Sequence, residues 1–197
     1  MHMISLSDGF SRSVKRMSRQ EIRLAGSGGQ GIILATVILA EAAIQAGMNT
    51  AQSQAYGPEA RGGSCKAETL ISDQTIGFTK VQNPTFLMAL TQKSLDQYGP
   101  EVSENCLVLI DSGLSAPQDM KAKRIVALPI LDTARTVVGK IQTANIVAVG
   151  CINDLLGITD AKTLEKAVLM HVPSGTEQLN IKALEEGFKL AEGHEEK

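Results

Sequence analysis

The chain has 197 residues, a formal net charge of −2 at pH 7 and 43% hydrophobic residues, which together indicate a folded globular protein. With 3% aromatic residues and no tryptophan it lacks the basic surface and the stacking side chains typical of nucleic-acid binding. The longest apolar run, residues 31–40, is too short to span a bilayer, and no secretory signal is visible. We therefore expect no membrane segment and a cytoplasmic location.

Metal-binding patterns are missing from the sequence. Its three cysteines are far apart, and none belongs to a C-x-x-C pair, so we expect neither an iron-sulfur cluster nor a zinc finger in this chain. The three histidines show no ligand-like spacing either. We predict no metal site, and an odd number of widely spaced cysteines favours a reducing compartment.

Residues 1–19 differ in composition from the rest of the chain. They carry four cations and a single acid, Asp8, among several serines. One interpretation is an organelle-targeting leader, which is rich in serine and arginine and poor in acids. The interpretation we favour is a disordered basic extension. We expect one domain over residues 20–192 and a short tail at 193–197.

The first patterned stretch, residues 22–35, predicts a strand, a glycine turn and the start of a buried helix. Its glycines fit G-x-G-x-x-G, in which glycine permits a sharp reversal and a close approach to the backbone, while the helix amides attract an anion. The residues that we expect to contact an anion or a partner are Gly26, Gly28, Gly29, Gln30 and Gly31.

A nicotinamide or flavin dinucleotide is one possible ligand of such a turn. A dinucleotide fold places an acid about 20 residues further on to bind a ribose hydroxyl. Residues 42–58 contain no acid, so the turn alone favours another use. A free-standing, Rossmann-like nucleotide-binding oxidoreductase remains an alternative.

The rest of the chain alternates apolar strands with helices. We expect strands at 51–56, 65–72, 75–78, 86–90, 106–111 and 124–129, with a hairpin joining the second and third of these at residues 73–74. We expect helices at 30–46, 94–98 (capped by Ser94), 141–156 (ended by Gly157), 161–172 (capped by Asp160) and 176–190. This pattern predicts a three-layer α/β fold with a mostly parallel sheet and helices on both faces.

A second glycine-rich segment follows the strand at 51–56, and its composition predicts a functional loop. It offers a hydroxyl, a carboxylate and a guanidinium, and Arg61 could bind a carboxylate or phosphate bidentately. An internal Glu59–Arg61 pair, or a loop that faces a partner without any ligand, is the alternative. The candidate residues are Tyr56, Gly57, Pro58, Glu59, Arg61, Gly62 and Gly63.

The two motifs together resemble a known family. Ala-Gly-Ser-Gly-Gly-Gln-Gly-Ile at 25–32, followed by Ser-Gln-Ala-Tyr-Gly-Pro-Glu-Ala-Arg-Gly-Gly at 53–63, is similar to the gamma subunit of 2-oxoacid:ferredoxin oxidoreductases. The resemblance extends over residues 20–192 and includes Asn145 as a possible supporting residue. The second motif is most similar to the 2-oxoglutarate branch, and the pyruvate, branched-chain and indolepyruvate branches remain alternatives.

The resemblance implies a Rossmann-like fold of the pyruvate-ferredoxin oxidoreductase domain III type. It also implies a complex that oxidatively decarboxylates a 2-oxoacid to its acyl-CoA and reduces ferredoxin. Thiamine diphosphate, magnesium and iron-sulfur clusters would lie on alpha, beta and delta (ferredoxin-like) subunits. This chain would be an accessory subunit with no catalytic residue and no cofactor of its own, in possible contact with coenzyme A. An isolated copy could form a homodimer.

From the residues and the resemblance we expect the two glycine-rich bends to lie together at the carboxyl ends of the strands, where open α/β sheets place their functional surface. Arg61 and the amides of residues 28–31 would donate to a partner carboxylate or to a phosphate of coenzyme A. A purely structural module, whose glycines serve close packing alone, is the remaining alternative.

Overall fold

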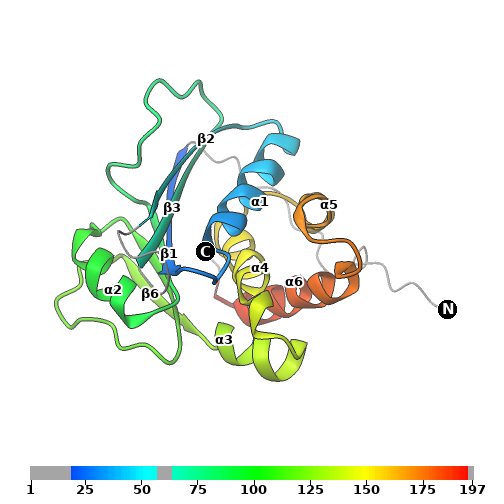
Figure 1. Cartoon of the computed structure of the whole chain (residues 1–197). Helices are drawn as coiled ribbons and strands as arrows, with labels where there is room; N and C mark the ends of the chain where they lie inside the picture. The colour runs from blue at the N-terminus through cyan, green and yellow to red at the C-terminus, as the bar shows by residue number, and fades with distance from the viewer. Residues whose placement is uncertain (1–18, 57–63, 195–197) are drawn as a thin grey trace.

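The computed structural model describes residues 19–56 and 64–194. A six-stranded sheet lies between two layers of helices (Figure 1). The strands are β1 (Arg19–Ser27), β2 (Asn49–Tyr56), β3 (Ser64–Ser72), β4 (Phe86–Ala89), β5 (Leu107–Asp111) and β6 (Arg124–Leu128). The helices are α1 (Ile32–Gln45), α2 (Gln92–Tyr98), α3 (Ile130–Asp132), α4 (Ala144–Leu156), α5 (Ala161–His171) and α6 (Glu177–Ala191). Single helical turns are η2 (Gly99–Glu101) and η4 (Ile141–Thr143), and η3 (Thr133–Val138) is a π-helix.

The strand order is β2-β3-β1-β4-β5-β6, and β3 alone runs opposite to its neighbours. Every residue of β4 and β5 is buried. That burial is the reason for their mostly apolar sequences, because a parallel strand covered on both faces has no side that faces solvent. The predicted mostly parallel sheet is confirmed.

Two hydrophobic layers flank this sheet. The larger lies between the sheet and the group formed by α1, α4, α5 and α6, and contains Ile22 and Leu24 of β1. The smaller lies under α2 and contains Ala25 and Leu87. The three-layer α/β architecture is confirmed, although α2 is the main helix on its face (Figure 1).

Helices α4 and α6 cross at two glycines. A Cβ atom on Gly187 would lie 2.2 Å from the carbonyl oxygen of Val147, and one on Gly150 would lie 2.6 Å from that of Leu184. Both obstacles are backbone atoms, which cannot rotate away. The two backbones therefore touch directly, and this contact joins the last helix to the layer that covers the sheet.

The predicted hairpin between residues 65–72 and 75–78 is wrong. Strand β3 pairs on one side with β2 and on the other with β1, so neither side is left for another strand. Residues 75–78 are not a strand, and Phe78 is 51% exposed. The hairpin of this sheet is β2–β3, which the sequence pattern did not indicate because the second glycine-rich segment separates its arms.

The predicted cap of α2 is displaced by one turn. The N-cap is Thr91, whose hydroxyl accepts from the Ser94 amide, while the Ser94 hydroxyl accepts from the Thr91 amide. Ser94 is therefore the third residue of a capping box and not the cap itself. The predictions for the caps at Asp160 and Gly157 are confirmed. None of the helices in the described ranges has the length and apolar character needed to traverse a bilayer.

Candidate functional site

The glycine turn joins the carboxyl end of β1 to the start of α1. Gly28 and Gly29 are exposed at its tip, and Gly29 has φ of 92°. Gly31 is the N-cap of α1 with φ of 70°, a left-handed conformation that other residues rarely adopt. The sequence places glycine where the turn needs positive φ.

The inner side of the turn is filled by a side chain of the turn itself. The Gln30 side-chain oxygen Oε1 accepts a hydrogen bond of 2.7 Å from the backbone amide of Ser27. The backbone amide of Gln30 donates in turn to the Ser27 carbonyl at 3.2 Å. A Cβ atom on Gly26 would lie 2.5 Å from Oε1 of Gln30. Gly26 thus leaves room for the Gln30 side chain, which braces the turn from within.

Asn145 holds the other end of the turn. It lies in the first turn of α4, is buried, and its Nδ2 atom donates to the Gly31 carbonyl at 3.4 Å. A Cβ atom on Gly31 would lie 2.5 Å from that same Nδ2 atom. The structure therefore brings Asn145, which the sequence separates by 114 positions, into contact with the glycine turn.

The start of α1 offers a partial positive charge to the tip of the turn. Among the described residues no side chain caps this helix, and its first turn contains no acid. The unpaired amides of a helix start carry a partial positive charge and favour an anion or a carbonyl oxygen. The exposed tip, at Gly28 and Gly29, is where such a group could approach.

The second glycine-rich segment, with Gly57, Pro58, Glu59, Arg61, Gly62 and Gly63, lies outside the described residues. Both of its attachment points are described. Ser27 pairs with Ser64, and Cys65 pairs with both Gly26 and Tyr56. Both ends of the segment therefore leave the sheet beside the glycine turn, at the edge where the parallel strands end.

A cluster of charged side chains lies on the α2 side of the sheet and was not predicted. Arg23 Nε donates to Glu68 Oε1 at 2.8 Å, and its guanidinium also pairs with Glu101. Lys66 Nζ lies 3.1 Å from the same Glu68 oxygen. The cations of Arg23 and Lys66 lie 5.5 and 5.6 Å from the centre of the Tyr98 ring.

Burial makes this cluster structurally important. Arg23 and Glu68 are 6% and 7% exposed, so loss of either would leave a buried charge with only part of its pairing, to Glu101 or to Lys66, and removing one partner of a buried pair typically costs about 3–5 kcal/mol. Burial also raises the pKa of Tyr98. The sequence does contain a signal, because Arg23 and Glu68 each lie near the middle of a strand, among mostly apolar residues. Local sequence does not indicate, however, that these two strands pair.

Asp111 ends β5 at the same edge of the sheet as the glycine turn. Its Oδ1 atom accepts from the Gly113 amide at 3.0 Å and its Oδ2 atom from the Leu131 amide at 2.8 Å. Both oxygens are thus used to fix the connections that follow β5 and β6. We assign Asp111 a structural role.

Metal ligands do not gather in the described part of the chain, where no group of three His, Cys, Asp or Glu side chains is placed to hold an ion. The three cysteines are free and buried. Burial raises the pKa of each thiol, to about 12 for Cys106. These thiols are therefore poor nucleophiles and poor metal ligands in the folded chain.

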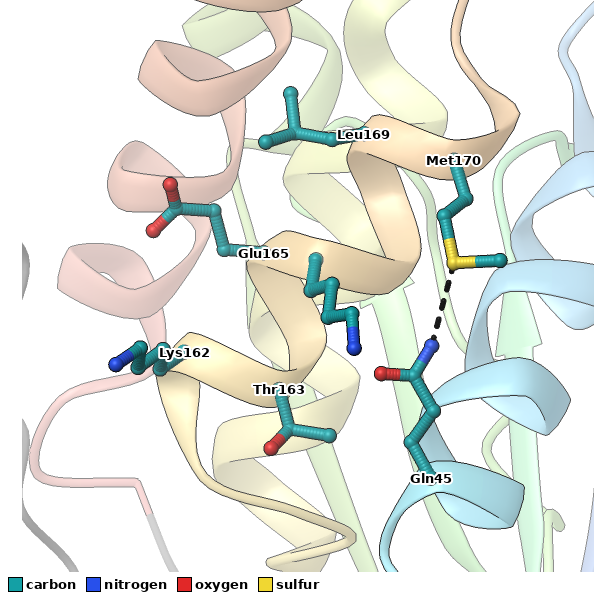
Figure 2. Close-up of a pocket in the computed structure, with 7 residues that line it drawn as sticks. Gln45, Lys162, Thr163, Glu165, Leu169 and Met170 are labelled. Carbon is teal, nitrogen blue, oxygen red and sulfur yellow. Dashed lines mark hydrogen bonds between the residues drawn. The ribbon is translucent and has the colours of Figure 1, made fainter.

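The one depression described, of about 680 Å³, is open and lies between the end of α1 and α5 (Figure 2). It is lined by Gln45, Lys162, Thr163, Glu165, Lys166, Leu169 and Met170. The Gln45 amide donates to the Met170 sulfur at 3.4 Å across it (Figure 2). Because Gln45 ends the helix that the glycine turn begins, the depression is roughly 20 Å from the turn, given the rise of a 14-residue helix. We do not assign it to the glycine-turn site.

Comparison with known proteins identifies the family. The sequence profile of the pyruvate ferredoxin/flavodoxin oxidoreductase family matches residues 21–190. Subunit KorC of 2-oxoglutarate synthase from Methanocaldococcus jannaschii is 41% identical over 176 residues, which cover 88% of this chain and 94% of KorC. The crystal structure of a keto/oxoacid ferredoxin oxidoreductase gamma subunit from Geobacter sulfurreducens superposes with a TM-score of 0.77 at 43% identity, covering 87% of this chain and 98% of that one.

A larger enzyme contains the same fold. The 2-oxoglutarate:ferredoxin oxidoreductase from Magnetococcus marinus, solved with 2-oxoglutarate, coenzyme A and succinyl-CoA, matches 89% of this chain and 31% of its own with a TM-score of 0.79. At 21% identity this likeness concerns the fold alone. The extent of the profile match and the near-complete coverage of KorC show that the chain belongs to the pyruvate ferredoxin/flavodoxin oxidoreductase family, in which it is of the gamma-subunit type.

Proposed function

We propose that this chain is the gamma subunit of a 2-oxoglutarate:ferredoxin oxidoreductase, in which it packs on the catalytic subunits in the cytoplasm. The observation that carries the proposal is the end-to-end similarity to a 2-oxoglutarate synthase subunit of nearly the same length. The complex oxidatively decarboxylates 2-oxoglutarate to succinyl-CoA and reduces ferredoxin. The gamma subunit is an accessory component of this enzyme and supplies surface rather than reacting groups.

The cofactors of the reaction belong to other subunits in this proposal. Thiamine diphosphate, magnesium and iron-sulfur clusters lie on alpha, beta and delta chains, where the delta chain is ferredoxin-like. In support, this chain corresponds to only 31% of the larger Magnetococcus enzyme chain, so the rest of that chain has no counterpart here. What the gamma chain contributes is binding and orientation, which is the usual part of a protein in cofactor chemistry.

The glycine turn and the second glycine-rich segment form the contact surface for a partner carboxylate or a coenzyme A phosphate. The register of β1, β2 and β3 supports this, because it attaches the segment at both ends beside the turn. The uncapped start of α1 supplies backbone donors there. Arg61, within the segment, supplies a guanidinium that can bind an anion with two parallel hydrogen bonds.

Replacing Arg61 in the assembled complex tests this role. In the complex with its co-expressed partners, Arg61→Ala should raise the KM for coenzyme A about tenfold or lower the yield of assembled complex, because one charge-assisted contact is worth roughly 1.5–3 kcal/mol. Arg61→Lys, which keeps the charge but loses the planar fork, should show an intermediate effect. Lys80→Ala removes an exposed cation elsewhere and is the matched control.

The two outcomes separate the possible contacts. A raised KM with normal assembly indicates coenzyme A, and poor assembly with an unchanged KM indicates a partner chain. Wild-type values for both quantities would remove the segment from the mechanism. Rates measured with 2-oxoglutarate, pyruvate and indolepyruvate then test the substrate branch, and a preference for either of the last two would contradict the proposal.

A further inference from the structure

Among the residues that the structure describes, strand β2 ends the sheet without the charges, prolines or bulges that usually protect an edge. Natural edge strands avoid pairing with other chains through charged residues, prolines, bulges or short length. The eight residues of β2, Asn-Thr-Ala-Gln-Ser-Gln-Ala-Tyr, contain no charge and no proline. They pair one to one with β3 from Asn49↔Ser72 to Tyr56↔Cys65, so no bulge interrupts the ladder.

The opposite edge of the sheet is built differently. Strand β6 has only five residues, begins with Arg124 and is followed directly by Pro129. The Arg124 guanidinium donates to the His194 carbonyl at 2.9 Å, which ties the chain's end across this edge. Within residues 19–56 and 64–194, the lack of edge protection is therefore particular to β2.

The sequence of β2 is also its own complement. Residues 51–55 read Ala-Gln-Ser-Gln-Ala in both directions. In an antiparallel pair of two such strands with a two-fold axis at Ser53, alanine lies opposite alanine, glutamine opposite glutamine and serine opposite serine. Small side chains at the centre of the pair approach without a clash, and each glutamine faces a side chain of its own kind. A two-fold interface requires such self-complementarity of one surface patch.

We propose that two copies of this chain associate edge to edge through β2, antiparallel and with Ser53 on the two-fold axis, so that two six-stranded sheets become one continuous sheet. Gln52 is exposed and lies opposite residue 54 of the second copy. Ser53 is half-buried on the other face of the strand, where its hydroxyl donates to Glu68 Oε2 at 3.2 Å. The buried Arg23–Glu68 cluster thus lies directly behind the axis and stiffens the paired strands.

Paired charges test both the surface and the register. Sedimentation of the purified full chain should give a mass that rises from monomer to dimer with concentration. The double substitution Gln52→Lys, Gln54→Lys places lysines opposite one another and should raise the dissociation constant of the dimer at least about tenfold. Gln52→Lys, Gln54→Glu has the same first substitution but sets opposite charges face to face, and it should restore the dimer at low salt.

Crosslinking gives an independent measurement. The two Ser53 positions would be about 4.5–5.5 Å apart between Cα atoms, within disulfide range, so Ser53→Cys should form a covalent dimer under mild oxidation. Asn49→Cys lies on the same strand and is exposed, but its two copies would be roughly 27 Å apart and should not crosslink. The native cysteines are buried and do not interfere.

A mass that stays monomeric at all concentrations would overturn the proposal. So would equal dissociation constants for the wild type and both charge variants, or crosslinking of Asn49→Cys as efficient as that of Ser53→Cys. Circular dichroism of each variant shows whether it is folded before association is measured. The experiment involves neither coenzyme A nor other subunits, so its result is independent of the proposed function.

Discussion

The four glycines of the turn have two different structural roles: two allow close packing, and two form the exposed tip. Gly26 and Gly31 are needed because Gln30 and Asn145 occupy the space that a Cβ atom would take. Gly28 and Gly29 are exposed at the tip, and a Cβ atom on Gly29 would meet nothing within 4 Å. The motif G-x-G-x-x-G therefore combines internal packing with an open surface, and only the second part is available to another molecule.

Gly31→Ala should destabilise the chain by about 3 kcal/mol, from the strain of a left-handed alanine plus the clash with Asn145. In an Asn145→Ala background the contacts with Nδ2 and Cγ are gone and the one with Cβ, at 3.2 Å, remains, so the same substitution should cost only about 1–2 kcal/mol. Urea unfolding of the four proteins in this cycle measures the difference. Gly175→Ala, at φ of 86° with nothing within 4 Å, is the control for backbone strain alone. Equal costs in both backgrounds would contradict the packing role of Gly31.

At the residue scale, the sequence predicted features that depend on neighbouring residues and missed contacts between residues far apart in the chain. The glycine turn could be located because its spacing is local. The contact between Gly31 and Asn145 could not be derived from patterning, since it joins residues 114 positions apart. The pair of Arg23 and Glu68 is similar, because its members belong to strands whose pairing depends on the order of the whole sheet.

At the scale of elements, the helix ends are the features that sequence described best. Asp160 caps α5 by accepting from the Thr163 amide at 2.9 Å and from the Thr163 hydroxyl at 2.7 Å. Burial acts to raise the pKa of Asp160, but these hydrogen bonds outweigh it, and the pKa lies below the ordinary value of 3.8. A cap of this kind is encoded within four residues, which explains why its prediction was correct.

Asp160→Ala should lower the free energy of unfolding by about 1 kcal/mol at pH 7. Because the pKa is lower in the folded chain, the charge of Asp160 contributes its full stability above the unfolded-state pKa, near 3.8, and this contribution is lost as the pH falls through the folded value. Urea unfolding at several pH values between about 7 and 3 should show the advantage of Asp160 over Asp160→Asn shrinking at the acid end. A constant difference would contradict the role of the charge.

Strand assignments from sequence succeeded where burial alone decides and failed where pairing decides. Strands β4 and β5 are buried on both faces, so their apolar runs were sufficient. Residues 75–78 have a suitable composition for a strand but no free partner, because β3 already has a neighbour on each side. The composition of a segment indicates whether it can form a strand, but whether it joins a sheet depends on a neighbouring strand with a free edge.

For the molecule as a whole, burial of all three cysteines has a measurable chemical result. Thiolates are the reactive form, and burial raises the pKa of each thiol. A disulfide reagent at pH 8 should therefore leave the native chain unmodified and titrate three thiols in guanidinium chloride. Asn49→Cys, with its exposed position, should react at once and serves as the positive control. Rapid modification of a native thiol would contradict the described burial.

The sheet order also constrains the time course of biosynthesis. Strand β1 leaves the ribosome first, yet both of its neighbours, β3 and β4, are made later, and β3 is inserted between β1 and β2. A nascent chain from which β4 has not yet emerged thus exposes strand β1 with an open side, since β4 ends at Ala89. During that interval the open side of β1 can pair with wrong partners, which is the kind of exposure that makes partly folded chains prone to aggregate.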